Sequence, residues 1–368
     1  MPKRIDSLYL HFPFCLHLCN YCDFYKKISQ NKVLDYQNYH TYLAQSFDLH
    51  QNLMERNGYS WAALKTLYIG GGTPSLWGKE GKIFLENFFK DKNLELSSDC
   101  EFTLEVNPGA WNDEVLSEWQ SFGANRFSLG IQSFDPQMIK YLDRKHSIND
   151  VYDTLEYFKK NNLNFSVDFM LGLPFSKELS RNVIDELKTA MSYGPSHFSV
   201  YILTVKDNYT HYKNLPDEEW IEKEFLQVAD YLCFEGFEHY EVSNFSKPLK
   251  QSRHNLNYWK SLSVAALGPS ATGFLKDERL RYKWKPNHPE MEFEYLTEEE
   301  FRLEKIYMGI RSEEGINTTD FSEEISAVVE GWKKRNLAYE AHGVVKLTSR
   351  GYLLLDSLMN DLFKLKLI

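Results

Sequence analysis

The sequence of 368 residues has little cysteine and no long hydrophobic run. It contains five cysteines, an odd number and too few for the disulfide framework of a secreted domain. No stretch is long and apolar enough for a transmembrane helix, and the basic residues 1–4 are not followed by the apolar segment of a signal peptide. We therefore expect a cytoplasmic protein without a membrane-spanning segment.

Positively charged residues are also fewer than negatively charged ones. The chain has 42 lysines and arginines against 52 aspartates and glutamates, which gives a formal net charge of -10. A negative surplus disfavours binding to nucleic acid and to anionic membranes, so neither is expected as a partner. What is present is ordinary for a folded protein: 43% of the residues are hydrophobic and 26% are charged. The length fits about two domains, at roughly 150 residues each.

Three of the cysteines are concentrated in one short segment. Cys15, Cys19 and Cys22 form a C-x3-C-x2-C pattern directly after the apolar residues 7–13. Thiolates are the soft ligands that iron-sulfur clusters require. Three thiolates on one loop hold three irons and leave a fourth iron to a ligand that is not protein. The spacing therefore predicts an iron-sulfur site with one open position.

A structural zinc site is the main alternative for this loop. Zinc takes four protein ligands in such sites, and the nearest candidates for the fourth are His11, His17 and Asp23. The loop lacks the paired C-x2-C knuckles that structural zinc sites usually have, so the iron-sulfur interpretation is favoured.

The first two thirds of the chain alternate β-rich segments with amphipathic helices. Strands are predicted at residues 8–12, 64–69, 101–106, 126–131, 165–170 and 197–203. Helices are predicted at residues 33–56, 80–89, 113–122, 149–160 and 181–193. Strands that are separated by helices pair in parallel through crossovers. The pattern predicts an α/β fold that forms an open or partial barrel of six β-then-α units.

The character of the sequence changes after residue 203. Further segments are a helix at 218–234, a strand at 240–245, a polar and aromatic stretch at 253–259, helices at 301–309, 323–336 and 352–363, and a hairpin within 340–348. From about residue 292 the composition indicates helices. We predict two domains, the barrel with its extension at residues 1–290 and a mostly helical, winged-helix-like domain at 291–368. The acidic setting argues against DNA binding by that second domain.

Glycine-rich or polar clusters follow four of the predicted strands. They lie at residues 70–74, 107–109, 132–134 and 171–174. The carboxyl ends of parallel strands meet at one edge, where ligands bind, so these loops should converge on the cysteine loop. Each cluster taken alone is also explained as an ordinary turn, the reading we favour for residues 107–109 by themselves.

These motifs together resemble the radical S-adenosylmethionine (SAM) superfamily. Within it they are similar to the branch of oxygen-independent coproporphyrinogen III oxidase and the heme chaperones of the HemW type. The resemblance rests on residues 9–24, 69–75, 105–109, 128–134, Asp168 before residues 172–174, and the H-N-x-x-Y-W pattern of residues 254–259. It covers nearly the whole chain and implies a partial (β/α)6 barrel of the radical SAM type.

The resemblance also implies roles for individual residues. Cys15, Cys19 and Cys22 would bind a [4Fe-4S] cluster whose fourth iron is chelated by the methionine part of SAM. The positions that match the family's SAM contacts are Tyr9, Gly71, Gly72, Thr73, Glu105, Gln132, Arg144 and Asp168. Carboxylates suit ribose hydroxyls or an ammonium group, and a guanidinium suits a carboxylate. For Arg144, an ordinary surface position is the alternative.

Two functions follow from this branch. The first is oxidative decarboxylation of coproporphyrinogen III in porphyrin biosynthesis, and the second is a heme chaperone that keeps the cluster and the SAM site. Three features favour the chaperone: Phe24 stands where the decarboxylase branch has another cysteine, only 14 residues precede Cys15, and residues 254–259 match the chaperone pattern. Decarboxylase activity is not expected, and whether radical chemistry is used stays open, as does the identity of any catalytic residue.

The heme-chaperone reading implies further ligands and partners. His254 would be an axial heme ligand, since neutral imidazole is a common one. A hydrogen-bonded structural histidine is the alternative. Partners would be heme, a heme-acceptor protein such as a respiratory enzyme, and an electron donor for the cluster.

Overall fold

The computed structural model describes residues 3–205, 208–320 and 323–364. In this part of the chain the largest sheet has nine strands in the order β11-β1-β4-β5-β6-β7-β8-β10-β9. Its six central strands are β1 (Lys3–Phe12), β4 (Tyr59–Gly71), β5 (Leu96–Val106), β6 (Arg126–Gln132), β7 (Phe165–Leu171) and β8 (His197–Ile202), all parallel. They are the six predicted strands, so the partial barrel of six β-then-α units is confirmed.

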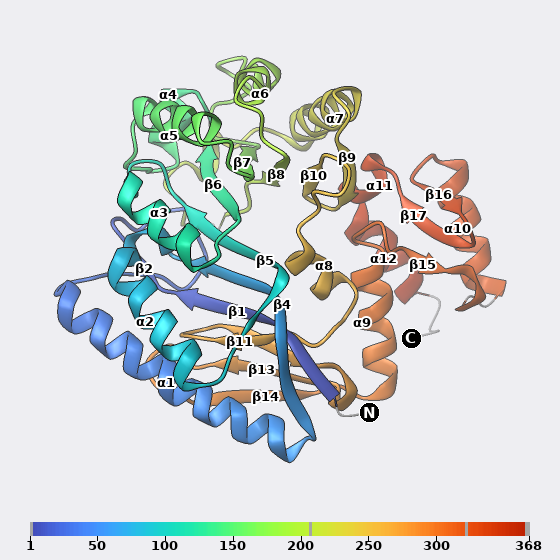
Figure 1. The fold of residues 1–368 in the computed structure, drawn as a ribbon. Coiled ribbons are helices and arrows are strands. Elements are labelled where there is room, and N and C mark those ends of the chain that lie inside the picture. The colour runs from blue at the N-terminus through green and yellow to red at the C-terminus, as the bar shows by residue number, and fades with distance from the viewer. Residues whose placement is uncertain (1–2, 206–207, 321–322, 365–368) are drawn as a thin grey trace.

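Helices cover the outer side of this curved sheet (Figure 1). They are α1 (Lys32–Arg56), α2 (Gly78–Asp91), α3 (Asp113–Phe122), the short α4 (Pro136–Tyr141), α5 (Ile148–Lys160), α6 (Val183–Met191) and α7 (Glu218–Phe234). Several begin at a polar residue whose side chain accepts a backbone N–H of the first turn, as Asn31, Asn112 and Ser147 do. Between sheet and helices lies one continuous apolar core.

Further strands extend both edges of the barrel, and they were only partly predicted from the sequence. β11 (Ala265–Leu267) pairs in parallel with β1. At the other edge, β9 (Glu238–Glu241) and β10 (Asn244–Ser246) form an antiparallel hairpin on β8. The single strand predicted at 240–245 was therefore wrong, because the chain reverses between Glu241 and Asn244. Helix α8 (Arg253–Trp259) lies against the barrel between these two edges (Figure 1).

A second, antiparallel sheet follows the barrel. It consists of β12 (Thr272–Leu275), β13 (Leu280–Trp284) and β14 (Met291–Tyr295). The helical composition predicted from about residue 292 was wrong for β14, where glutamates alternate with large apolar residues at the period of a strand. β14 belongs to the sheet of β13 although the predicted domain boundary separates residues 290 and 291.

The C-terminal part has a small apolar core of its own, which includes Trp332. Around it lie α9 (Glu298–Gly309), β15 (Ile316–Asn317), α10 (Glu323–Lys334), β16 (Ala338–Ala341), β17 (Val344–Leu347), α11 (Ser349–Leu353) and α12 (Leu355–Phe363). The predicted hairpin is present as β16 and β17. The winged-helix assignment and the boundary at 290/291 stay predictions. No helix among the described residues has the length and apolar character needed to cross a membrane.

Candidate functional site

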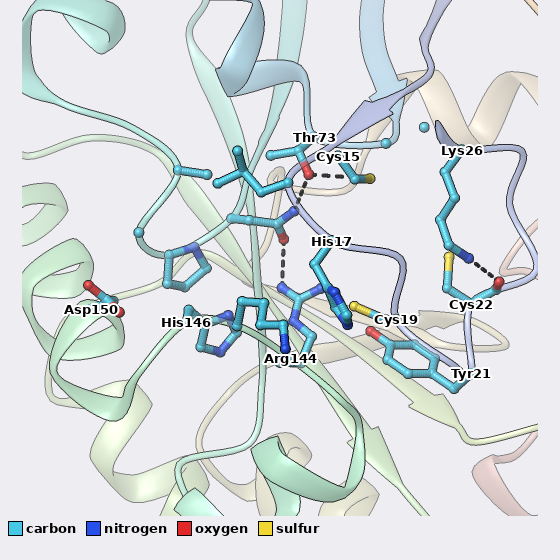
Figure 2. Close-up of a pocket in the computed structure, with 18 residues that line it drawn as sticks. Cys15, His17, Cys19, Tyr21, Cys22, Lys26, Thr73, Arg144, His146 and Asp150 are labelled. Carbon is cyan, nitrogen blue, oxygen red and sulfur yellow. Dashed lines mark hydrogen bonds between the residues drawn. The ribbon is translucent and has the colours of Figure 1, made fainter. Parts of the chain in front are cut away.

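Two adjacent cavities open at the carboxyl ends of the barrel strands. The first, here called the outer cavity, is lined by the cysteine loop and by the loops after β4, β5 and β6 (Figure 2). The second, the inner cavity, continues into the barrel and has a volume of about 450 Å³. This volume lies in the range of small-molecule sites. Both cavities are lined by Tyr21, Cys22, Gly71, Gly72, Asn107 and Arg144, which form a common wall.

The cysteine loop is closed by backbone pairing at its two ends. Residues Phe14–Cys15 (β2) pair in parallel with Lys27–Ile28 (β3), and the Lys27 amide donates to the Pro13 carbonyl at 2.8 Å. Inside the loop, the Lys26 ammonium donates to the Cys22 carbonyl (Figure 2). The loop is therefore fixed at its base and presents its cysteines to the outer cavity.

The three cysteines are free thiols of intermediate burial, and all of them line the outer cavity. Burial raises the pKa values of Cys15 and Cys19. Two smaller effects act in the opposite direction: the hydrogen bond from Thr73 lowers the pKa of Cys15, and the nearby charge of Arg144 lowers that of Cys19. Among the described residues, no three cysteine, histidine or acidic side chains meet at a point where they could hold one metal ion. Three thiols that line one cavity can each bind a different iron of a cluster.

A chain of hydrogen bonds connects Cys15 with Arg144 (Figure 2). The Thr73 hydroxyl donates to the Cys15 sulfur at 3.6 Å and accepts from the Asn107 Nδ2 at 2.8 Å. The Asn107 Oδ1 in turn accepts from the Arg144 Nη2 at 2.7 Å. A second bond, to the Gly130 carbonyl at 2.7 Å, fixes the same guanidinium nitrogen. Arg144 is thus held in the common wall. The alternative prediction, that it is an ordinary surface residue, was wrong.

The glycines after β4 let two chain segments approach closely. The Gly72 amide donates to the Phe12 carbonyl at 2.7 Å, and the Thr73 amide donates to the Phe14 carbonyl at 2.8 Å. A Cβ atom on Gly72 would lie 2.6 Å from the Phe14 oxygen. Gly71 has a φ of 112°, and a Cβ there would lie 2.6 Å from the His11 ring. These glycines are required by contacts within the chain itself, whatever ligand they also face.

Two acidic side chains face the inner cavity. Glu105 accepts from the Tyr68 hydroxyl at 2.9 Å and from the Gly71 amide at 3.0 Å. Asp168 accepts from the Ser128 hydroxyl at 3.0 Å. Burial raises the pKa of Glu105 to about 7 and the pKa of Asp168 to about 6. Both groups therefore change protonation near neutral pH and respond to any charge placed in the cavity.

The end of β6 is distorted at the cavity wall. Gln132 lines the inner cavity and has a φ of 71°, and the pairing of β6 with β7 shifts its register between Leu129 and Gln132. Gly130, in the same stretch, has no room for a side chain, because a Cβ would lie 2.4 Å from the Asn107 Oδ1. The irregular strand end thus makes space for the Asn107 and Arg144 side chains.

Two of the predicted site residues do not line either cavity. Tyr9 lies on β1 with its ring 6.0 Å from the ring of Tyr68, which does line the inner cavity. His254 is 2% exposed and lies 5.3 Å from the Tyr68 ring. Its Nδ1 shares a hydrogen bond with the Thr66 hydroxyl at 3.0 Å, while its Nε2 is buried without a hydrogen bond in the described structure. The next residue, Asn255, lines the inner cavity.

The other ten predicted residues are brought together. Cys15, Cys19 and Thr73 line the outer cavity, Glu105, Gln132 and Asp168 line the inner one, and Cys22, Gly71, Gly72 and Arg144 line both. The sequence reasoning missed Asn107, which it read as part of a turn, and Tyr68. Both could have been considered from the sequence, because Tyr68 lies within a predicted strand and Asn107 directly follows one.

The family comparisons agree with this geometry. Residues 9–187 match the model of the radical SAM superfamily. The chain is 30% identical to the heme chaperone HemW of Bacillus subtilis over 95% of this chain and 97% of the relative. It is 34% identical to the heme chaperone HemW of Haemophilus influenzae over 81% and 79% of the two chains.

A solved structure shares the fold. The coproporphyrinogen III oxidase of Escherichia coli, a radical SAM enzyme, superposes with a TM-score of 0.76 over 98% of this chain and 90% of that chain, at 18% identity. At this identity the likeness concerns the fold alone. The HemW relatives, covered to 97% and 79% of their lengths at 30% and 34% identity, decide the narrower assignment: the chain belongs to the radical SAM superfamily and, within it, to the HemW family.

Proposed function

We propose that this protein is a heme chaperone, which binds heme and transfers it to an acceptor protein while retaining a cluster and SAM site. The similarity to HemW proteins over nearly the full chain carries the proposal. A feature of the site supports it: Phe24, which stands where the decarboxylase branch has a cysteine, lines the inner cavity with 71% of its surface exposed. Its ring offers an apolar face and no thiol.

The superfamily implies a [4Fe-4S] cluster and SAM. Cys15, Cys19 and Cys22 would hold the cluster, since all three of their thiols line one cavity. When bound and reduced, such a cluster supplies the electron that cleaves SAM in this superfamily. The hydrogen bond from Thr73 to the Cys15 sulfur would stabilise the thiolate form that binds iron.

The SAM-binding roles are divided between the two cavities. Arg144, fixed by Asn107 and by the Gly130 carbonyl, would pair with the carboxylate of SAM. Glu105 and Asp168 would accept from its ammonium or ribose hydroxyls. The remaining predicted contacts are Gly71, Gly72, Thr73, Gln132 and Tyr9, of which Tyr9 would act from its position beside Tyr68.

His254 is proposed as an axial heme ligand. Burial, and then the charge of Arg126, lower its pKa to about 3, so the imidazole is neutral as a ligand must be. Its Nε2 has no hydrogen-bond partner among the described residues. Because the side chain is only 2% exposed, binding would require Tyr68 or helix α8 to move aside. The acceptor protein, the electron donor for the cluster and a cytoplasmic location belong to this proposal as well.

The cluster assignment is tested on anaerobically reconstituted protein. Wild type should show [4Fe-4S] absorbance, and a triple variant with Cys15→Ala, Cys19→Ala and Cys22→Ala should not. Cys100→Ala serves as the control, since this buried thiol lies outside both cavities. A cluster spectrum retained in the triple variant would exclude these three ligands.

The function is tested with two assays on the reduced holoprotein. Incubation with heme and then with an apo heme protein should transfer heme, and incubation with coproporphyrinogen III and SAM should yield no decarboxylated product. Accumulation of that product would instead establish the decarboxylase alternative. His254→Ala should weaken heme binding, whereas His50→Ala should not, because His50 is equally buried but bonds to Tyr282 far from the cavities.

A further inference from the structure

A second arginine lies at the far end of the inner cavity, away from the cysteine loop. Arg126 is the first residue of β6, whereas Gly130, whose carbonyl fixes Arg144, lies near its last. The Arg126 side chain lines the inner cavity, and the residue is 5% exposed. The cavity therefore has a guanidinium at each end, and the proposed cluster and SAM contacts use only one of them.

Arg126 lacks the partner that a buried guanidinium normally has. Its hydrogen bond to the Thr103 hydroxyl is long, at 3.5 Å. No carboxylate of the described residues lies within the 4.0 Å of an ion pair with it. A guanidinium does not lose its proton in proteins, so it keeps its charge even here. Burial of an unpaired charge is costly, and the fold tolerates this cost at a position that faces a cavity.

Two acidic groups of the cavity accept hydrogen bonds from other donors, although Asp168 lies near enough to Arg126 to be affected by its charge. Asp168 accepts from the Ser128 hydroxyl, and Glu105 accepts from the Tyr68 hydroxyl and the Gly71 amide. By contrast, the buried Arg181 has a direct carboxylate partner, Glu186, at 2.6 Å. Arg126 therefore differs from Arg181, which is also buried but has a carboxylate partner.

The wall of the inner cavity combines aromatic and polar surface. Tyr68 and Tyr201 both line it, and Tyr201, near the carboxyl end of β8, has 42% of its surface accessible. Arg126 is also near enough to His254 to lower its pKa. A ligand that reaches Arg126 would meet a fixed positive charge in a cavity with aromatic walls, and His254 lies close by without lining the cavity.

We propose that Arg126 forms a carboxylate subsite, and that its occupant is a propionate group of heme. The inference rests on the proposed heme-binding function and extends it by naming the group that the inner end of the cavity recognises. A guanidinium matches a carboxylate through two parallel N–H···O bonds, and such charge-assisted bonds are about twice as strong as neutral ones. The bound carboxylate would supply the direct ion pair that the described residues do not provide.

The test compares heme with heme dimethyl ester, in which both propionates are esterified. Each ligand is titrated into the cluster-reconstituted full chain without SAM, and binding is followed by the Soret difference spectrum. Wild type should bind heme about ten- to hundredfold more tightly than the ester, the range expected for hydrogen bonds to a charged group. Arg126→Gln should abolish this preference and leave ester affinity unchanged. Arg126→Lys should retain part of it, and Arg350→Gln, an exposed control, all of it.

The outcomes separate this inference from the function on which it rests. If wild type binds no heme, the proposed function fails and the subsite with it. If wild type binds heme and the ester equally, or Arg126→Gln keeps the preference, heme binding stands and the subsite is refuted. The wild-type comparison decides even if Arg126→Gln does not fold. A parallel titration with SAM guards against the other carboxylate source: a loss of SAM affinity in Arg126→Gln with the heme preference intact would also refute the assignment.

Discussion

Replacing Asn107 by alanine should disable the SAM site without touching a cluster ligand. The Asn107 amide joins the two halves of the common wall, donating to Thr73 at 2.8 Å and accepting from Arg144 at 2.7 Å. The second bond involves a charged donor and is worth about 1.5–3 kcal/mol, and the first about 0.5–1.5 kcal/mol. If the Arg144 bond is what orients the guanidinium toward SAM, its loss should weaken SAM binding by about ten- to hundredfold.

The measurement is equilibrium dialysis of SAM against anaerobically reconstituted protein, with iron and sulfide content determined on the same samples. Asn107→Asp is the matched variant, because its carboxylate still accepts from Arg144 but no longer donates to Thr73. We expect near wild-type SAM affinity in Asn107→Asp and a large loss in Asn107→Ala at equal cluster content. Affinity within about twofold of wild type in Asn107→Ala would refute the positioning role, since a bond to a charged group should be worth more.

Three further predictions concern stability. Glu186→Ala removes the 2.6 Å partner of the buried Arg181 and should lower the free energy of unfolding in urea by about 3–5 kcal/mol; a loss below about 1 kcal/mol would contradict this account of the pair. Burial raises the pKa of Glu105 from 4.5 to about 7, so the folded state binds this proton more tightly and stability should fall as pH rises between these values. Urea unfolding across that pH range should show that the free energy of unfolding depends less on pH in Glu105→Gln than in wild type. An equal pH dependence in the two proteins would contradict the raised pKa of Glu105. Gly71→Ala should lower the thermal midpoint markedly, because the new Cβ would lie 2.6 Å from the His11 ring at a φ of 112°; an unchanged midpoint would show that the loop can relax.

The barrel strands could be predicted from sequence because they contain apolar runs, four of which end at a glycine-rich or polar cluster. β6, for example, is buried at every position from Arg126 to Ile131. The β9 and β10 hairpin could not, because its reversal after Glu241 depends on contacts with distant residues, such as the Val242 amide bonding to the Arg311 carbonyl at 2.8 Å. β14 was missed because none of its residues is buried: Met291 is half-buried and the other four are exposed, so no apolar run marks the strand.

The candidate site divides in the same way. Cys15, Cys19 and Cys22 are adjacent in sequence, so their spacing alone indicated a shared ligand. Asn107 and Arg126 could not be singled out, since the role of each depends on what lies across the barrel. Asn107 bonds to Thr73 and Arg144, which come from other loops. Arg126 has no acidic side chain of the described residues within ion-pair distance.

The inner cavity has consequences for how two ligands are handled together. Arg144 and Arg126 face one volume of about 450 Å³, which Glu105 of the neighbouring strand β5 also lines. SAM at one end and a heme carboxylate at the other would therefore have coupled binding equilibria. Thermodynamic reciprocity then requires that SAM changes the affinity for heme by the same factor by which heme changes the affinity for SAM. A change in SAM occupancy would then change the affinity for heme, and a titration of heme at two SAM concentrations would measure this factor.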